Sequence, residues 1–208
     1  TINVTTGALV HTHATAGMGS NRGGNNTLNL YGGLVDEYAD IKMGANGSTS
    51  RVNLHGGILR VRNITGSTGS EYLTFNGGTL QPRQDGQTMA DALLSAVVST
   101  NGAVVDTSLA SYTIAQKLAH DPALGGTADG GLVKFGTNTL SLTGAGNTFN
   151  GLVDVRNGLL RARLGGTNDL NVAATNAFFD ALGFRATVGT LSGVGTLTNG
   201  IIAVTGTL

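Results

Sequence analysis

The chain has 208 residues, with 34 Gly, 2 Pro and neither Cys nor Trp. Twelve acidic and twelve basic residues cancel, and charged residues make up only 12% of the chain. These values exclude collagen, a disordered chain and thiolate or disulfide chemistry, and they leave no global field that would attract nucleic acid or an anionic membrane. No apolar run approaches the ~18 residues of a membrane helix, so we expect no membrane insertion. Abundant Thr, Asn and Gly favour an all-β protein.

A short unit recurs along the chain, in which alternating apolar residues lead to a Gly and continue beyond it. Segments 52–62 and 153–163 agree in this pattern across eleven positions. The marker glycines of all copies are Gly7, Gly33, Gly57, Gly78, Gly102, Gly158 and Gly200. Successive markers are 21 to 26 residues apart up to Gly102, and the last two intervals are close to double that. A strand–turn–strand repeat of this length is typical of one coil of a β-solenoid.

The repeat therefore predicts a parallel β-solenoid, a single domain over residues 1–208 with about 21–28 residues per coil. Alternation places Val52 and Leu54 inside and Asn53 and Arg60 outside, and the Gly supplies a positive φ at the corner. Asn precedes the marker at Asn76, Asn101, Asn157 and Asn199, where stacked amides can form a ladder between coils. A β-sandwich is the competing fold, but it would favour two-residue hairpin turns between antiparallel strands.

Two segments depart from the strand pattern. Residues 89–98 have apolar side chains at helical spacing after a possible N-cap at Thr88, and residues 176–182 lie between Thr175 and Gly183. Both are predicted as short helices on the side of the solenoid. The polar stretch 120–131 (HDPALGGTADGG) is predicted as a protruding loop.

Residues 98–164 resemble a known bacterial repeat. They contain Gly-Gly-Leu-Val-Lys-Phe-Gly-Thr-Asn-Thr-Leu-Ser-Leu-Thr-Gly-Ala-Gly-Asn-Thr-Phe-Asn-Gly, followed by Val-Asp-Val-Arg-Asn-Gly-Leu-Leu. This is similar to the autotransporter-associated β-strand repeat of bacterial surface and secreted proteins, although the usual Gly-x-Gly before Thr-Leu is here Gly136-Thr137-Asn138. The resemblance implies a right-handed, passenger-type β-helix that is exported to the cell surface or beyond. The translocating C-terminal barrel of such proteins is absent from this sequence.

No convincing catalytic or metal constellation is present. His11 and His13 lie two apart on a predicted strand, but no third ligand is near them in sequence. Asp36, Glu37 and Asp40 form the densest acidic group, beside Lys42, and read as a solvated turn rather than the spaced carboxylates of a polysaccharide-cleaving enzyme. We therefore expect a protein without catalytic residues, metal or cofactor.

Arginines suggest a surface site. Arg60 and Arg62 on one coil and Arg83 on the next are predicted to point outward, and Arg161 and Arg163 repeat the pattern. Stacked like charges repel, so this stripe requires partners. Local acids such as Asp85 or Glu71, or an external anionic polysaccharide, would neutralise it.

The terminal segments also read as strands. Apolar residues at Ile2, Val4, Ile201, Ile202, Val204 and Leu208 are therefore candidates for self-assembly. They can pair head-to-tail with another copy, or with further coils of a longer chain. The leading hypothesis is an extracellular structural scaffold or fibre subunit. The alternative is an adhesin or a carbohydrate-binding fragment of a bacterial surface protein, with its contacts on the arginines or on loop 120–131.

Overall fold

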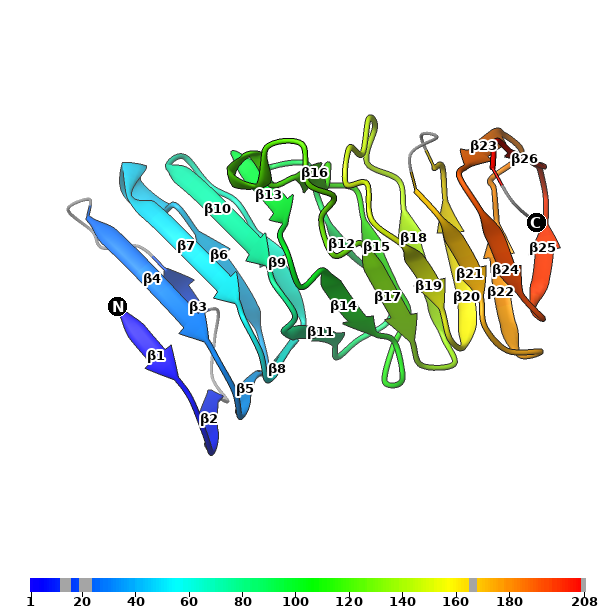
Figure 1. Ribbon diagram of the computed structural model, residues 1–208. Helices are drawn as coiled ribbons and strands as arrows, with labels where there is room; N and C mark the ends of the chain where they lie inside the picture. Colours follow the sequence, from blue (N-terminus) through cyan, green and yellow to red (C-terminus); the bar gives the residue numbers. More distant parts are fainter. Residues whose placement is uncertain (12–15, 19–23, 165–167, 207–208) are drawn as a thin grey trace.

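The computed structural model describes residues 1–11, 16–18, 24–164 and 168–206. They form an elongated β-solenoid of stacked coils, with the N- and C-terminal segments at opposite ends (Figure 1). Every strand pairing is parallel, which confirms the predicted class. Each coil contributes one strand to each of up to three sides of the rod.

The first side is sheet A, which ends in the middle of the rod. It contains β1 (Ile2–Val4), β4 (Asn25–Leu30), β7 (Thr49–Leu54), β10 (Ser70–Phe75), β13 (Ser95–Val98) and β16 (Ala119–His120). Two strands at the C-terminal end, β23 (Arg185–Val188) and β26 (Ile201–Val204), form a separate pair.

The second side, sheet B, runs the full length of the rod. It contains β2 (Ala8–His11), β5 (Leu34–Glu37), β8 (Ile58–Val61), β11 (Thr79–Pro82), β14 (Ala103–Asp106), β17 (Leu132–Phe135), β19 (Val153–Val155), β21 (Leu170–Val172) and β24 (Leu191–Gly193).

The third side is divided into two sheets that meet where β9 and β12 lie next to each other. The N-terminal part contains β3 (Ala16–Met18), β6 (Asp40–Met43) and β9 (Asn63–Thr65). The C-terminal part contains β12 (Gln87–Met89), β15 (Tyr112–Ile114), β18 (Thr139–Leu142), β20 (Gly158–Ala162), β22 (Ala177–Asp180) and β25 (Thr196–Thr198). The only helical elements among the described residues are two short 3-10 turns, η1 (Ala45–Gly47) and η2 (Pro122–Leu124).

Alternating side chains build one continuous core inside the coils. In sheet A, Leu30, Leu54 and Phe75 are stacked in register and fully buried. Each such side chain contributes on the order of 1.5–3 kcal/mol by burial. Outside the same sheet the amides of Asn3, Asn29 and Asn53 form a ladder, with each Nδ2 donating to the preceding Oδ1 at 2.8 Å. Stacking thus satisfies both faces of the sheet.

The predicted amide ladder at the marker positions forms only in part. Asn76 Oδ1 accepts the backbone N–H of Asn101 at 3.0 Å. Asn157 Oδ1 accepts from Nδ2 of Asn176 at 3.1 Å, whereas Asn199 donates to Asp180.

The marker glycines occupy more than one corner. Gly7, Gly33, Gly57 and Gly102 have φ between 65° and 78° and turn the chain from sheet A to sheet B, and Gly131 (φ 70°) is the missing copy in the next coil. At the corner between β10 and β11, Gly77 and not the marker Gly78 has the positive φ. Gly158 is instead the first residue of β20, at the corner that follows β19, and Gly200 lies between β25 and β26. One local unit therefore serves corners on different sides of the rod.

The two predicted helices are wrong. Residues 89–98 contain the end of β12, a bend and then β13, and β22 occupies most of residues 176–182. Met89 and Ala96, two members of the predicted helical stripe, are buried on two successive strands. Their spacing resembles that of a helix because the bend between the two strands interrupts the two-residue alternation of buried and exposed side chains.

The loop predicted at 120–131 leaves the wall between β16 and β17. It carries η2, and residues 122, 123 and 125–128 are exposed. Asp121 caps η2, with its Oδ1 accepting the Ala123 N–H at 3.0 Å.

Corner packing predicts a contrast between two glycines. A Cβ at Gly57 would lie 2.6 Å from both Gly32 C and Gly33 O, whereas Gly47, with a similar φ of 72°, has open space there. Both Gly→Ala variants incur left-handed strain of about 1–2 kcal/mol. We expect Gly57→Ala to lose a further ~1–3 kcal/mol by overpacking. Urea unfolding of the two variants measures the difference, and equal losses would contradict the role of coil-to-coil contact.

Candidate functional site

The predicted arginine stripe lies on the outer face of sheet B, where it is largely neutralised. Asp36 accepts from Arg60 Nη1 at 3.4 Å and from Arg83 Nε at 3.0 Å, and also pairs with Arg83 Nη2. Arg60 Nε donates to Gln81 at 2.7 Å, and Gln81 donates to Asp106 at 2.7 Å. From coil to coil, this column therefore contains an acidic, a basic, a neutral and again an acidic side chain.

The other predicted arginines divide into two kinds. Arg62 pairs with Asp40 at 2.8 Å and Arg161 pairs with Asp180 at 3.0 Å. Arg163 has no carboxylate partner among the described residues, and its guanidinium lies over the Phe184 ring at 4.8 Å. Only Arg163 of the five candidates keeps an unneutralised charge at the surface.

The predicted local partners of the arginines, Asp85 and Glu71, are wrong. Asp85 accepts from the backbone N–H of Ser111 at 2.6 Å. Glu71 is buried, and its Oε1 accepts from the N–H groups of Ser67 and Gly69 at 3.1 Å. The actual partners lie one or two coils away, so sequence proximity did not indicate them.

The acidic group at 36–40 does not converge on a common point. Asp36 and Asp40 each pair with arginines, whereas Glu37 accepts from Ala39 N at 3.0 Å and contacts His11 Nδ1 at 2.9 Å. His13 lies outside the described residues. Across the described part of the chain, no group of three or more His, Cys, Asp or Glu side chains is placed to hold a metal ion.

The self-assembly candidates are distributed unevenly over the two ends. Ile2 is 54% exposed in β1, but Val4 is already covered by the next coil. Ile202 and Val204 are half-buried on the inward side of β26, whereas Ile201 faces outward and is 65% exposed. Leu208 lies outside the described residues. Sequence analysis missed Leu9 and Leu197, which stand in core registers of the first and last coils and remain over one third exposed.

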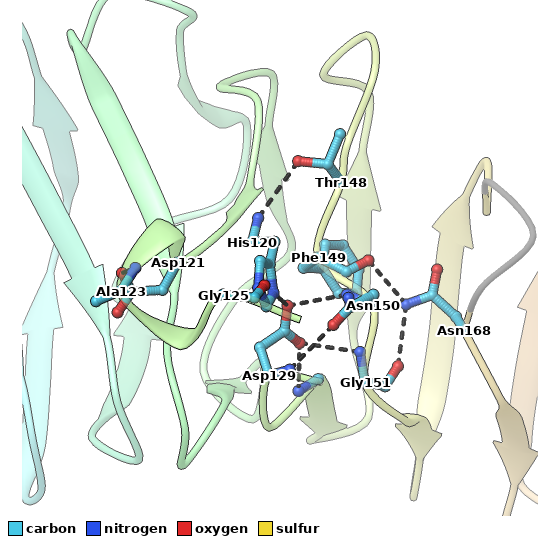
Figure 2. A network of polar contacts seen from close by, with 11 residues as sticks. His120, Asp121, Ala123, Gly125, Asp129, Thr148, Phe149, Asn150, Gly151 and Asn168 are labelled. Carbon is cyan, nitrogen blue, oxygen red and sulfur yellow. Dashed lines mark hydrogen bonds and ion pairs between the residues drawn. The ribbon is translucent and has the colours of Figure 1, made fainter. Parts of the chain in front are cut away.

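A polar cluster closes the base of loop 120–131 (Figure 2). The fully buried carboxylate of Asp129 accepts backbone N–H groups from Gly131, Asn150 and Gly151, each at 2.9 Å, and contacts His120 Nδ1 at 2.9 Å. The other ring nitrogen, Nε2, lies 3.2 Å from the carbonyl oxygen of Gly125. Both ring nitrogens thus face acceptors, an arrangement that suits the imidazolium.

The charge of His120 depends on this geometry. The side-chain hydrogen bond to Asp129 is the main cause that raises the pKa of His120, and the Gly125 carbonyl and the Asp121 carboxylate act in the same direction. Protonated His120 therefore links the tip of the loop, at Gly125, to its base, at Asp129.

Sequence analysis missed a lysine inside the solenoid. Lys134 is stacked between Val105 and Val155 in the core register of sheet B, and its side chain is fully buried. Its Nζ donates to Thr107 Oγ1, Gly136 O and Asn157 O at 2.6–2.8 Å. Burial lowers the pKa of the Lys134 ammonium to about 8. The sequence did contain a signal for this burial, because Lys134 lies two residues after the apolar Leu132 and so faces the same side of the strand.

Comparisons with protein-family models, curated proteins and solved structures gave no match. The fold therefore defines the class, a parallel β-solenoid, and the likeness to autotransporter-associated repeats stays a prediction. No helix in the described ranges has the length and apolarity needed to cross a membrane.

Lys134 makes the stability of the solenoid depend on alkaline pH. Its folded pKa of about 8 lies below the ~10.4 of an unfolded lysine, so the unfolded chain binds the proton more tightly. The free energy of unfolding should therefore rise from about pH 8 to 10, by at most ~1.4 kcal/mol per pH unit.

Removing the ammonium tests this dependence. Lys134→Met should abolish the alkaline rise and lower stability at pH 7 by a few kcal/mol, because three oxygens lose their donor. Urea unfolding at several pH values measures both effects. Exposed Lys117→Met is the control, and an unchanged rise in Lys134→Met would contradict the assignment.

The His120 link predicts pH-dependent ordering of the loop. Because the folded pKa of His120 is raised, its stabilising effect is complete below the unfolded value of ~6.5 and is lost as pH rises through the folded value. Hydrogen exchange of amides in 121–128, corrected for intrinsic rates, should show protection falling with pH. His120→Gln should remove the pH dependence, His55→Gln should keep it, and a pH-independent wild type would refute the link.

Proposed function

We propose that this chain is a structural β-solenoid element of a bacterial surface or extracellular assembly, whose copies stack head-to-tail. The observation that carries the proposal is the match between its two end coils. Each end coil has strands that are paired on one side only, with apolar side chains in line with the core. In both end coils the strands follow the three sides of the rod in the same order. The extracellular setting rests on the repeat resemblance.

The order of sides follows from the corner before sheet B. Backbone hydrogen bonds join this corner in successive coils. At one end of the rod Leu34 N donates to Gly7 O, and at the other end Gly206 N donates to Gly189 O. Gly189 N in turn donates to Asn168 O. The strand β26, which precedes Gly206, therefore occupies the side that β1 occupies before Gly7.

The side chains of the two end coils are complementary in register. Ile202 and Val204 point inward from β26, two residues apart, as Ile2 and Val4 do from β1. On the next side, Leu9 of β2 would cover Leu191 of β24. A copy placed on the last coil would continue the core without a change of direction, and backbone edge pairing would hold the joint.

Such a joint is heterologous and does not close, so it propagates as a fibre. The nine strands of sheet B give each copy a length of ~40 Å along the axis. Electron microscopy of the purified chain at micromolar concentration should show fibres with this axial repeat.

The alternative, an adhesin that uses the arginine stripe, has weaker support. Four of its five candidate arginines are paired with Asp36, Asp40 or Asp180. These charges already have partners within the protein. We likewise propose no catalytic role for the carboxylates of this group.

Complementation between blocked ends tests the polarity of the joint. Ile2→Asp places a charge on one end face and Ile202→Asp places one on the other, so each variant alone should stay monomeric. Their mixture should stop at dimers, because one intact pair of faces remains. Light scattering and microscopy measure the species formed.

Neighbouring residues provide the controls. Ile201→Asp changes an outward-facing residue next to Ile202 and should leave fibres intact. Leu197→Asp, at a more exposed site, repeats the end-face test if Ile202→Asp unfolds. A wild-type chain that stays monomeric, or fibres lost equally in Ile201→Asp, would overturn head-to-tail stacking.

A further inference from the structure

A surface cleft of about 600 Å³ lies beside the C-terminal half of the rod. The turn 143–147 that follows β18 forms one wall, and Arg163, Leu182 and Phe184 form the other. The volume is within the ~300–1,000 Å³ of small-molecule sites, which are largely apolar with a few polar groups. This cleft has no part in the stacking of end coils.

Arg163 is the one charged residue that lines the cleft. Its side chain is exposed, its guanidinium lies 4.8 Å from the centre of the Phe184 ring, and no described carboxylate pairs with it. The nearby strand arginine, Arg161, is already paired with Asp180 at 3.0 Å. The wall therefore offers a planar fork of donors for which the described residues provide no carboxylate partner.

The rest of the lining is apolar or small, with two polar side chains. Phe184 is 50% exposed, so its ring is available to an apolar surface. Thr143 provides a hydroxyl, and Asn147 can offer its Nδ2 donor because its Oδ1 already accepts the Leu118 N–H at 2.9 Å. A ligand that fits these groups has one anionic end and an apolar face.

Backbone strain lies in the same wall. Leu182 has φ of 58°, which is rare for a side chain of this size. Its N–H donates to Asp180 Oδ1 at 2.7 Å, so the Arg161–Asp180 pair holds the turn that presents Phe184. Strain of this kind clusters at binding sites.

We propose that this cleft binds a ring-bearing carboxylate, with the carboxylate on the guanidinium of Arg163 and the ring against Phe184. Arginine matches a planar carboxylate with two parallel hydrogen bonds, which a lysine or a spherical anion does not reproduce. The ring is that of a uronic acid unit of an acidic glycan or that of an aromatic acid. Both kinds of ligand carry one carboxylate and a ring that can stack on Phe184.

The test is a titration of the full chain with glucuronate and with benzoate. Binding is measured by NMR, from the shifts of the arginine Nε–H signals and of the signals of turn 143–147. Glucose and sulfate are the comparison probes, because each carries only one half of the proposed chemistry. We expect either carboxylate to bind at least tenfold more tightly than both probes. The tighter of the two identifies the source of the ring.

Variants then assign the binding to the cleft. Arg163→Gln should weaken binding at least tenfold, and Arg163→Lys should weaken it several-fold because the fork is lost. The matched control is Arg156→Gln, an arginine that also lies over a ring, Phe135 at 5.9 Å, but has Asp154 at 2.7 Å. It should bind as wild type does.

Three results would overturn the proposal: no binding of either carboxylate, sulfate binding as tight as carboxylate, or equal losses in Arg163→Gln and Arg156→Gln. Exposed Arg163 should be replaceable without unfolding, and thermal unfolding checks this. Phe184→Ala gives a second variant in which charge is kept and the ring is lost. Fibre formation is measured separately, so failure of stacking and failure of binding are distinguishable.

Discussion

Every coil of this protein is fixed by the requirement that each residue lies on its equivalent in the next coil, one strand spacing away. A slip of one residue in this register would turn every side chain of a strand to the other face of the sheet. One inward column of sheet A is apolar in coil after coil, through Leu30, Leu54 and Phe75, whereas the column of Asn26, Ser50 and Glu71 is polar. Corners must also approach closely, so a side chain at Gly57 would meet the backbone of the previous turn.

The same requirement governs the polar residues. Outward side chains are stacked as closely as inward ones, so a column must alternate in charge or share hydrogen bonds. Asp36, Arg60 and Gln81 meet this condition on sheet B, and the Asn3–Asn29–Asn53 amides meet it on sheet A. Lys134 is a cation in an otherwise apolar column of sheet B, and carbonyl oxygens at the corner compensate it.

Alternation and glycine spacing were enough to predict the solenoid, the inward positions of Val52 and Leu54 and the loop at 120–131. They could not distinguish one corner from another, because the unit around Gly158 is locally the same as that around Gly57. Strand breaks were also hidden: Met89 and Ala96 belong to different sides, yet their spacing suggested a helix. Contacts such as Arg83 with Asp36, 47 residues apart, depend on how coils superimpose, which no local pattern reports.

Register stacking has a consequence for how the chain acquires its structure. Partners in neighbouring coils are separated by about one coil of sequence, such as the 24 residues between Asn29 and Asn53, wherever they lie in the rod. The loop-closure entropy of adding a coil therefore does not grow with the length already formed. Each coil needs only its predecessor as a template, so ordering can advance along the chain from one end. A longer rod of this kind would therefore form at the same entropic cost per coil as a short one.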